Sequence, residues 1–435
     1  MDPFFILFTV LLLLLMFLGS GLWVGLGLYA VSITSLALFR NMPVDKLMAQ
    51  LSFNSITSPE MIALPMFILM AEILFRTKLS DSLFNGLRPW VHWLPGRLLH
   101  VNVIGCTLFA AVSGSSAATA STVGRITLSE LFRRGYDRNL VIGSLAGAGT
   151  LGFLIPPSII MIIYGVLAEA SILKLFMAGI LPGLLLSIGF VGYIAARAFM
   201  NPSIVPDEAE RPTWSDRFFG LVNLGPVVFL MVMVLGSMYA GIASPSEAAA
   251  IGVLGATIIA AWQRTLTWKT IRDASMGTVR TTSMIGLIVA GAMCLSVAMA
   301  YLGAPAAIAT KIASMNLSPV GLIILLLVFY AVLGCVLDGL SAIVMTLPIT
   351  LPLALAAGYD KIWFGVFIVI VVEMAQITPP VGFNLFVIQG LTKEKMGRIA
   401  RATVPFFLIM CGFAILLAVF PEIATFIPDR VQLNG

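Results

Sequence analysis

Residues 126–137 read ITLSELFRRGYD, and the same outline returns as ITLPLALAAGYD at residues 349–360. The letters ITL and GYD match at an offset of 223 residues, whereas Arg133 and Arg134 of the first copy are replaced by alanines in the second. The match indicates one unit used twice. The loss of charge indicates that the two copies lie in different surroundings.

Further matches follow at nearly the same offset, each pairing a residue of the first half with one of the second. They are Pro156-Pro157 with Pro379-Pro380 and, after an insertion of two residues, Gly114 with Gly339 and Ser116 with Ser341. Four matches in the same order are typical of an internal duplication.

The composition is that of a membrane protein. Hydrophobic residues make up 60% of the chain and charged residues only 10%, whereas a soluble domain carries about 25% charged residues. Apolar runs recur at or above the ~20 residues that cross a bilayer as a helix, and no short alternating segments typical of a barrel are present. We therefore expect an all-α polytopic membrane protein.

The basic residues separate the two copies. The loop with Arg133, Arg134 and Arg138 is basic, and its partner around Asp360 and Lys361 is neutral. Three other loop pairs show the same contrast: Arg76, Lys78, Arg88 and Arg97 against Lys311; Arg264, Lys269, Arg272 and Arg280 against Lys46; and Lys393, Lys395, Arg398 and Arg401 against Lys174. Under the positive-inside rule the two halves then cross the membrane in opposite orientations.

Inverted repeats are common in secondary transporters. We expect a first repeat at residues 1–200, a cytoplasmic linker at 201–218 and a second repeat at 219–435. Loop charge also requires residues 98–130 and about 319–357 to enter the membrane and return, which predicts two re-entrant helical hairpins. In a bacterium this protein would be a multi-pass protein of the inner membrane.

The first candidate site is VSGSSAATASTVG at residues 112–124. Close helix packing through small residues would explain it. Alternatively, this is a hairpin tip whose freed carbonyls and hydroxyls bind a cation, because irregular backbone at this depth is tolerated only where it is buried or lines a cavity. A break in the helix is expected at residues 113–116.

The two proline pairs predict discontinuous helices, with a simple kink as the alternative. Proline removes an amide donor inside a helix, so one half-helix would end near Thr150 or Ala375 and the next would begin at the prolines. The new N-terminus favours an anion, and the carbonyls that end the preceding half suit Na⁺.

Charged residues within the apolar runs are expensive and are candidates for function. Asp338 is a candidate cation ligand or coupling carboxylate, with a surface position as the alternative. Arg125 is a candidate contact for an anionic substrate or an interfacial anchor, and Glu72 and Glu373 are interpreted as packing or capping groups. No GxxxxGK[ST] sequence, credible nucleophile set or nucleic-acid-binding pattern is present, so we expect no enzyme and no nucleic-acid partner.

Four segments together resemble the large membrane subunit of TRAP (tripartite ATP-independent periplasmic) transporters, the DctM-like family. They are LPMFILMAEIL at residues 64–74, LFAAVSGSSAATASTVG at 108–124, GTLGFLIPPSIIMIIYG at 149–165 and EMAQITPPVGFNLFVIQG at 373–390. The resemblance implies an elevator-type fold, coupling to Na⁺, and import of a small organic anion such as a C4-dicarboxylate or sialic acid. It also implies two protein partners, a periplasmic substrate-binding protein and a small four-helix membrane subunit.

Carried over residue by residue, the resemblance assigns three sets of residues. A first Na⁺ site would comprise Ser113, Gly114, Ser115, Gly149 and Gly152, and a second Gly334, Asp338, Thr378 and Gly382. Substrate would lie near Ser116, Thr119, Pro157, Thr378 and Asn384, and Arg125 is added to this set because of its charge. Two alternatives stay open: a passive channel built on the same small-residue hairpins, and a family member that carries a neutral or zwitterionic solute.

Overall fold

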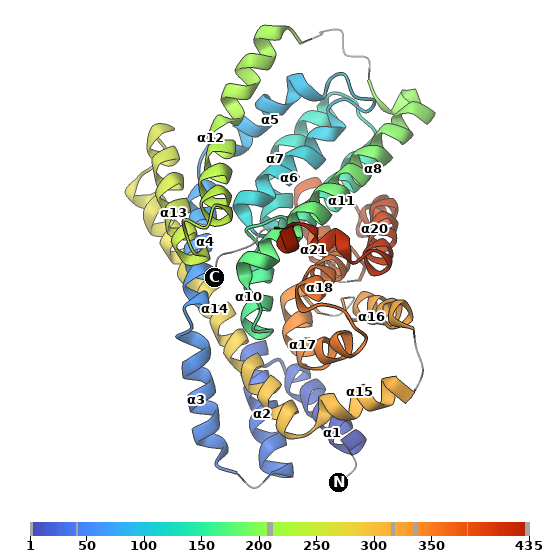
Figure 1. Ribbon diagram of the computed structural model, residues 1–435. Helices are drawn as coiled ribbons and strands as arrows, with labels where there is room; N and C mark the ends of the chain where they lie inside the picture. The colour runs from blue at the N-terminus through green and yellow to red at the C-terminus, as the bar shows by residue number, and fades with distance from the viewer. Residues whose placement is uncertain are drawn as a thin grey trace.

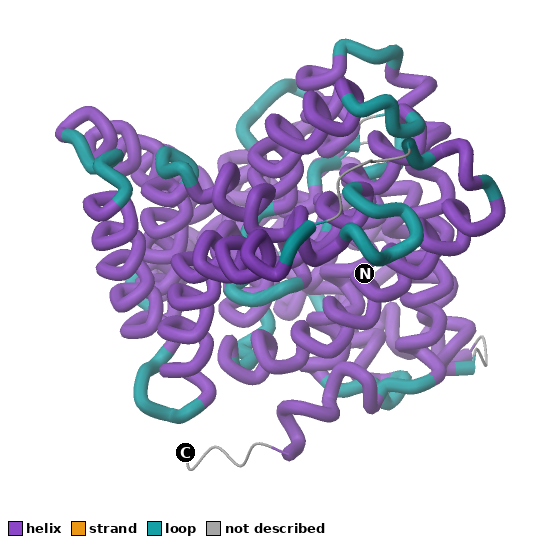
Figure 2. The backbone as a smooth tube through the Cα atoms, turned by 90° about the horizontal axis from the view of Figure 1, so that it is seen from above, coloured by secondary structure: helices purple, strands orange, loops and turns teal. Residues whose placement is uncertain are grey.

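The computed structural model describes residues 3–40, 42–206, 212–314, 318–334, 337–380 and 382–430. Within these ranges the chain is helical and contains no strand (Figure 2). Six helices are long and apolar enough to cross a membrane, and up to eight if each of two bent helix pairs counts as one span. Helices suit this environment because all of their backbone hydrogen bonds lie within one segment.

One group of helices combines the first part of each half. It consists of α1 (Pro3–Gly19), α2 (Val24–Phe39), α3 (Val44–Ile56), α4 (Glu60–Leu74) and α5 (Leu79–Val91), with α12 (Trp214–Tyr239), α13 (Pro245–Trp262), α14 (Trp268–Tyr301) and α15 (Ala304–Ser314). Helix α4 packs on α13, α2 and α3 on α14, and α5 on α12 (Figure 1).

A second group combines the later part of each half. From the first half come α6 (Leu99–Ser113), α7 (Ser116–Arg133), α8 (Arg138–Gly149), α9 (Leu151–Leu154), α10 (Ile159–Leu167) and α11 (Ile172–Met200). From the second half come α16 (Pro319–Leu333), α17 (Gly339–Ala356), α18 (Lys361–Gln376), α19 (Phe383–Thr392), α20 (Met396–Val419) and α21 (Glu422–Arg430). The halves interleave here, since α8 packs on α20, α7 on α19 and α11 on α18.

The repeated GYD letters encode the same loop twice. Gly135 has φ +84° and Gly358 has φ +90°, a left-handed conformation that glycine adopts at little cost after a helix. The tyrosine that follows is buried in both copies. Asp137 and Asp360 then cap α8 and α18 by accepting hydrogen bonds from backbone N–H groups. The duplication seen in the sequence is therefore a duplication of local structure.

Loops rich in basic residues contact one another. The Arg76 guanidinium donates to the Asp273 carbonyl at 3.2 Å, and the Lys78 N–H donates to the Gln263 side chain at 2.8 Å. Arg138 pairs with Glu394 at 2.9 Å. Loops that are predicted to share a membrane face thus lie together, although their sequence separations are large.

Loops of the other class also lie together. The Tyr164 hydroxyl donates to the Lys361 carbonyl at 2.7 Å, and the Lys361 amine donates to the Glu169 carbonyl at 3.4 Å. Arg40 donates to the Tyr301 carbonyl through Nη2 at 2.6 Å. Arg40 also belongs to the loop with Lys46, so this end of the molecule has fewer cations than the other but is not free of them.

The predicted linker at 201–218 contains less irregular structure than expected, because helices occupy part of it. A short helix, η1 (Pro202–Ile204), follows α11, and α12 begins at Trp214. The early start has a local cause: Thr213 and Asp216 form a reciprocal capping box at the N-terminus of α12. Residues 207–211 lie outside the described part of the chain.

The contact of α8 with α20 depends on small residues. A Cβ on Gly143 would overlap with the Ala402 carbonyl oxygen. We expect Gly143→Ala to lower the free energy of unfolding by about 1–3 kcal/mol, the usual cost of overpacking. Gly192→Ala on α11 is the control, because nothing lies within 4 Å of its Cβ position. Thermal unfolding in detergent should show a loss for the first variant and no loss for the second.

Candidate functional site

The helix break predicted at residues 113–116 is present. Helix α6 ends at Ser113 and α7 begins at Ser116, and the two helices pack against each other. Between them Gly114 has φ +59°, which glycine tolerates because it has no Cβ. The tip of the turn is formed by Gly114 and Ser115.

Hydroxyl groups hold the inside of this tip. The Oγ atoms of Ser113 and Thr119 lie 2.6 Å apart, and the Thr119 hydroxyl donates to the Ser115 carbonyl at 2.8 Å. Thr119 is fully buried. Ser113 of the predicted cation site and Thr119 of the predicted substrate site are therefore in direct contact. The Thr119 hydroxyl bonds within the tip.

The proline pairs interrupt two helices as predicted, but the helices restart later than expected. Helix α8 and the short α9 lead to Pro156-Pro157, and α10 begins at Ile159 at an angle of 41°. Ser158 caps α10 by accepting a hydrogen bond from the Met161 N–H at 3.2 Å. The serine rather than proline thus sets the start of α10, because its hydroxyl satisfies a free backbone donor.

The second break has the same form. Helix α18 ends at Gln376, Pro379-Pro380 follow, and α19 begins at Phe383 after Gly382. In both copies the prolines lie in the connection and not at the first helical position.

The first hairpin tip docks on the first helix break. A Cβ on Gly152 would lie 2.6 Å from the Ser115 carbonyl oxygen and 2.6 Å from the Ser116 Cα. The Ile159 N–H donates to the Gly114 carbonyl at 3.3 Å, and a Cβ on Gly149 would lie 2.8 Å from the Ala120 Cβ. The structure therefore brings together all five residues of the predicted first Na⁺ site: Ser113, Gly114, Ser115, Gly149 and Gly152.

The second hairpin lies against the second break in a similar way. A Cβ on Gly334 would overlap with Ala375, and a Cβ on Gly382 would lie 2.8 Å from the Thr378 carbonyl oxygen. Gly334 of the second hairpin thus lies against the end of α18, whereas Thr378 and Gly382 belong to the break itself. Residues 335–336 of this tip and residue 381 lie outside the described residues.

Asp338 occupies a helix cap. Its Oδ2 accepts from the N–H groups of Leu340 and Ser341, both at 3.2 Å, and the residue is exposed. The carboxylate therefore satisfies free donors at the start of α17.

The predicted substrate residues are only partly gathered. Ser116 and Pro157 lie at the first tip and break, and Thr378 lies at the second. Asn384, in the first turn of α19, is fully buried, and its amide atoms have no partner among the described residues. Arg125 is exposed and lies nine residues beyond Ser116 on α7, about 13 Å along the helix at 1.5 Å per residue.

Glu373 is the residue whose importance the sequence did not show. It lies on α18 with only 1% of its surface exposed. Its Oε1 accepts hydrogen bonds from the Ser116 hydroxyl and from the Phe153 N–H, the latter at 3.1 Å. A carboxylate of the second half thus joins the tip and the break of the first half. Its Oε2 has no partner among the described residues.

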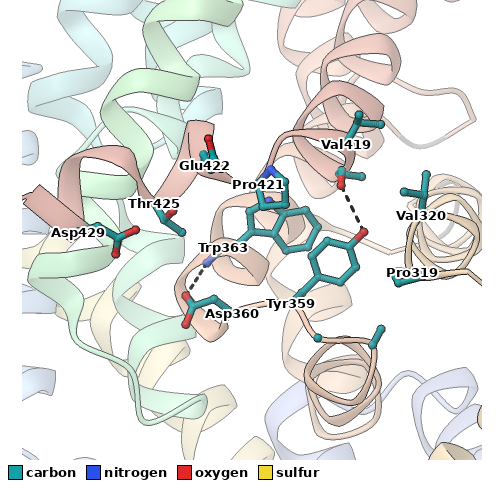
Figure 3. Close-up of a pocket in the computed structure, with 13 residues that line it drawn as sticks. Pro319, Val320, Tyr359, Asp360, Trp363, Val419, Pro421, Glu422, Thr425 and Asp429 are labelled. Carbon is teal, nitrogen blue, oxygen red and sulfur yellow. Dashed lines mark hydrogen bonds between the residues drawn. The ribbon is translucent and has the colours of Figure 1, made fainter.

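A pocket of about 620 Å³ lies elsewhere, at the second GYD loop (Figure 3). Tyr359 and Trp363 stack beside it, and Asp360, Glu422 and Asp429 line it. Asp360 is separated from the second break by the full length of α18, about 24 Å for 16 residues. Three carboxylates make this pocket a poor site for an organic anion, so the candidate site is the pair of docked helix breaks.

Two substitutions test whether Glu373 stabilises the protein as a hydrogen-bond acceptor or only by filling space. Glu373→Leu leaves two buried donors without an acceptor, at a cost of about 1–3 kcal/mol each, so we expect a clear loss of thermal stability. Glu373→Gln keeps a carbonyl oxygen for Ser116 and Phe153 and should retain most of the stability. Equal unfolding temperatures for the two variants would show that these hydrogen bonds do not hold the tip.

Comparison with known proteins gives a consistent result. Residues 9–423 match the family model described as "Tripartite ATP-independent periplasmic transporter, DctM component". The chain is 31% identical to the C4-dicarboxylate TRAP transporter large permease protein DctM of Rhodobacter capsulatus, with 97% of this chain and 98% of the relative covered. It is 32% identical to the ectoine/5-hydroxyectoine TRAP transporter large permease protein UehC of Ruegeria pomeroyi, with 98% of each covered.

A third relative is longer than this chain. The isethionate TRAP transporter permease protein DctMQ of Oleidesulfovibrio alaskensis is 30% identical, with 98% of this chain but 66% of the relative covered.

Among solved structures, the chain is similar to the Alcanivorax borkumensis YdaH transporter. The TM-score is 0.67 at 14% identity, with 94% of this chain and 98% of the other covered. This similarity concerns the fold alone. The sequence relatives are named as permease proteins and not as enzymes. The chain is a multi-pass membrane protein that belongs to the DctM family of large permease components of tripartite ATP-independent periplasmic (TRAP) transporters.

Proposed function

We propose that this permease imports a small organic anion by Na⁺ symport through an elevator movement. The observation that carries the proposal is the docking of each hairpin tip on a broken helix, with Gly152 against Ser115 and Gly334 against Ala375. Each contact brings backbone of a hairpin against backbone of a helix break, and at the first break the Ser115 carbonyl and the Thr119 hydroxyl lie at this contact. Such oxygen groups are the ligands that half-helix ends offer to Na⁺ in other transporters.

The arrangement of the loops supports an inverted orientation of the two halves. Basic loops from both halves meet through Arg76 with Asp273 and Arg138 with Glu394, while the partner loops meet through Lys361 and Glu169. In a parallel duplication, equivalent loops of the two halves would lie on the same face of the membrane, and the contrast in their charge would be unexplained.

The two groups of helices support an elevator movement. Helices α1–α5 pack with α12–α15, and helices α6–α11 pack with α16–α21. Both hairpins and both breaks belong to the second group, so we assign to it the movement of substrate and to the first group the fixed scaffold. The helix pairs between the groups, such as α14 with α17 and α4 with α10, would be the sliding surfaces.

Cation coupling is supported by the buried oxygens at the first break. The Ser115 carbonyl and the Thr119 hydroxyl lie together at the tip, and Glu373 Oε2 is buried without a partner. A buried carboxylate oxygen without a donor or cation is costly. A cation held near the first break would give this oxygen a partner.

Substrate and partners are proposed at the level of chemical class. A small organic anion fits the N-terminal ends of α10 and α19, which carry partial positive charge, and Asn384 offers unpaired amide atoms at one of them. Relatives are named for C4-dicarboxylate, isethionate and ectoine, so a zwitterionic solute is the second candidate. We propose a periplasmic binding protein and a small four-helix membrane subunit as partners.

Labelling with a membrane-impermeant maleimide tests the inverted orientation. Arg133 and Ala356 occupy equivalent repeat positions, and both are exposed. In intact cells carrying an otherwise cysteine-free chain, we expect Ala356→Cys to react and Arg133→Cys to react only after the membrane is opened. Equal labelling of both positions in intact cells would contradict the inverted arrangement.

Binding of Na⁺ can be measured without knowing the substrate. We expect NaCl to raise the unfolding temperature of the purified protein more than KCl or choline chloride, because Na⁺ binds the folded tip and break. Gly152→Ala places a Cβ against the hairpin tip and should raise the Na⁺ midpoint at least about tenfold, or about 1.4 kcal/mol. Gly192→Ala should leave the midpoint unchanged.

Uptake into proteoliposomes then tests transport itself. With the cognate binding protein present, accumulation of radiolabelled succinate or sialic acid should require an inward Na⁺ gradient. Concentrative uptake without Na⁺ would disprove the coupling. Uptake that never exceeds the external concentration would favour the channel alternative.

A further inference from the structure

The N-terminal ends of α8 and α20 lie side by side. Arg138 of α8 donates to Glu394 at 2.9 Å, and Arg398 of α20 donates to Asn139 of α8 at 3.0 Å. Arg398 also pairs with Glu394 at 3.3 Å. A pocket of about 580 Å³ opens at this junction, and its lining includes Asn139, Lys395, Gly397, Arg398 and Arg401.

The basic residues around this pocket repel one another and have few acidic partners within the protein. Lys395, Arg398 and Arg401 recur every three residues, so they lie near one another at the start of α20. Cations at a helix N-terminus oppose the helix dipole. The acidic groups nearby are Glu394, which forms ion pairs with both Arg138 and Arg398, and Asp137, which caps α8. Within the described residues, Lys395 and Arg401 form no ion pair.

Backbone donors add to the positive potential. The residue before α20, Lys395, makes no side-chain cap, and Gly397 in the first turn is exposed with nothing within 4 Å of its Cβ position. The first N–H groups of a helix have no acceptor within the helix. The pocket thus combines two guanidinium groups, a lysine amine and the N-terminal end of a helix, which together suit a phosphate group.

An apolar stripe continues from the pocket along α20. Val404, Leu408 and Leu416 follow Arg401 at helical spacing and are 48%, 59% and 41% exposed. Gly412, on the same stripe, has nothing within 4 Å of its Cβ position. Because α20 is one of the helices long enough to span a membrane, this stripe lies where an acyl chain would run.

We propose that the pocket between α8 and α20 binds the phosphate headgroup of an anionic phospholipid, with one acyl chain along the α20 stripe. The positive-inside rule explains why basic residues lie at this end of the molecule. It does not explain why three of them line one hollow at the start of an uncapped helix, directly above exposed apolar side chains. The site lies away from both helix breaks and does not depend on Na⁺ coupling.

Thermal unfolding of the purified full-length chain in a neutral detergent tests the site. We expect phosphatidylglycerol to raise the unfolding temperature in a saturable way, and phosphatidylethanolamine at the same concentration to have little effect. The double variant Lys395→Ala with Arg401→Ala should bind phosphatidylglycerol about 30-fold more weakly, from about fivefold for each basic residue. Native mass spectrometry should show fewer bound lipids for this variant.

The matched control is Lys269→Ala with Arg272→Ala. These two exposed cations lie near the start of α14, but Thr267 caps that helix. The control variant should keep wild-type affinity for phosphatidylglycerol. An equal loss of affinity in both double variants would show that phosphatidylglycerol responds to general surface charge, and it would overturn the proposal.

Further measurements distinguish a lipid site from a site for a free anion. Inorganic phosphate at millimolar concentration should compete weakly with phosphatidylglycerol. Phosphate that stabilises the protein as strongly as the lipid would indicate a free-anion site and overturn the assignment to lipid. Phosphatidylglycerol that leaves the wild-type unfolding temperature unchanged and shows no bound lipid would overturn the site altogether. Lys395→Gln with Arg401→Gln, which keeps side-chain polarity, should repeat the loss of affinity if the alanine variant folds poorly.

Discussion

Backbone groups released at the two helix breaks impose the main constraint on this molecule. In lipid, an N–H or C=O without a partner costs several kcal/mol, so a broken helix is stable only where other protein groups cover it. At the first break the cover comes from the hairpin tip and from α18. The Gly114 carbonyl accepts from Ile159, and Glu373 accepts from Phe153. The first tip, the first break and Glu373 therefore support one another.

Much of this arrangement could be predicted from the sequence. The offset of 223 residues identified two copies of one loop, and Gly135 with Gly358, and Asp137 with Asp360, adopt the same conformations and caps in the structure. The serine and glycine run at residues 113–116 and the two proline pairs marked real interruptions. Such local signals are reliable because glycine and proline act through the backbone geometry of their own positions.

Other features could not be predicted, for physical reasons. The helix after Pro157 begins at Ile159 because the Ser158 hydroxyl provides a cap, and proline alone does not reveal which residue will do so. Glu373 was interpreted as a packing or capping group because its partners, Ser116 and Phe153, are more than 200 residues away in the chain. Arg125 resembles a site residue by its nearness to the serine run, but the rise of α7 carries it away from the tip.

The position of Glu373 has a consequence for how the halves can evolve and move. At the repeat offset its counterpart is Thr150, a neutral residue whose hydroxyl donates to the Gly147 carbonyl at 2.6 Å and lies 3.6 Å from the Met410 sulfur. The carboxylate therefore breaks the twofold resemblance at the centre of the molecule. The two halves are no longer interchangeable, and separation of the α7 start from α18 disconnects the Ser116 hydroxyl from the carboxylate. Any movement that separates these two helices would therefore break a hydrogen bond that links the two halves.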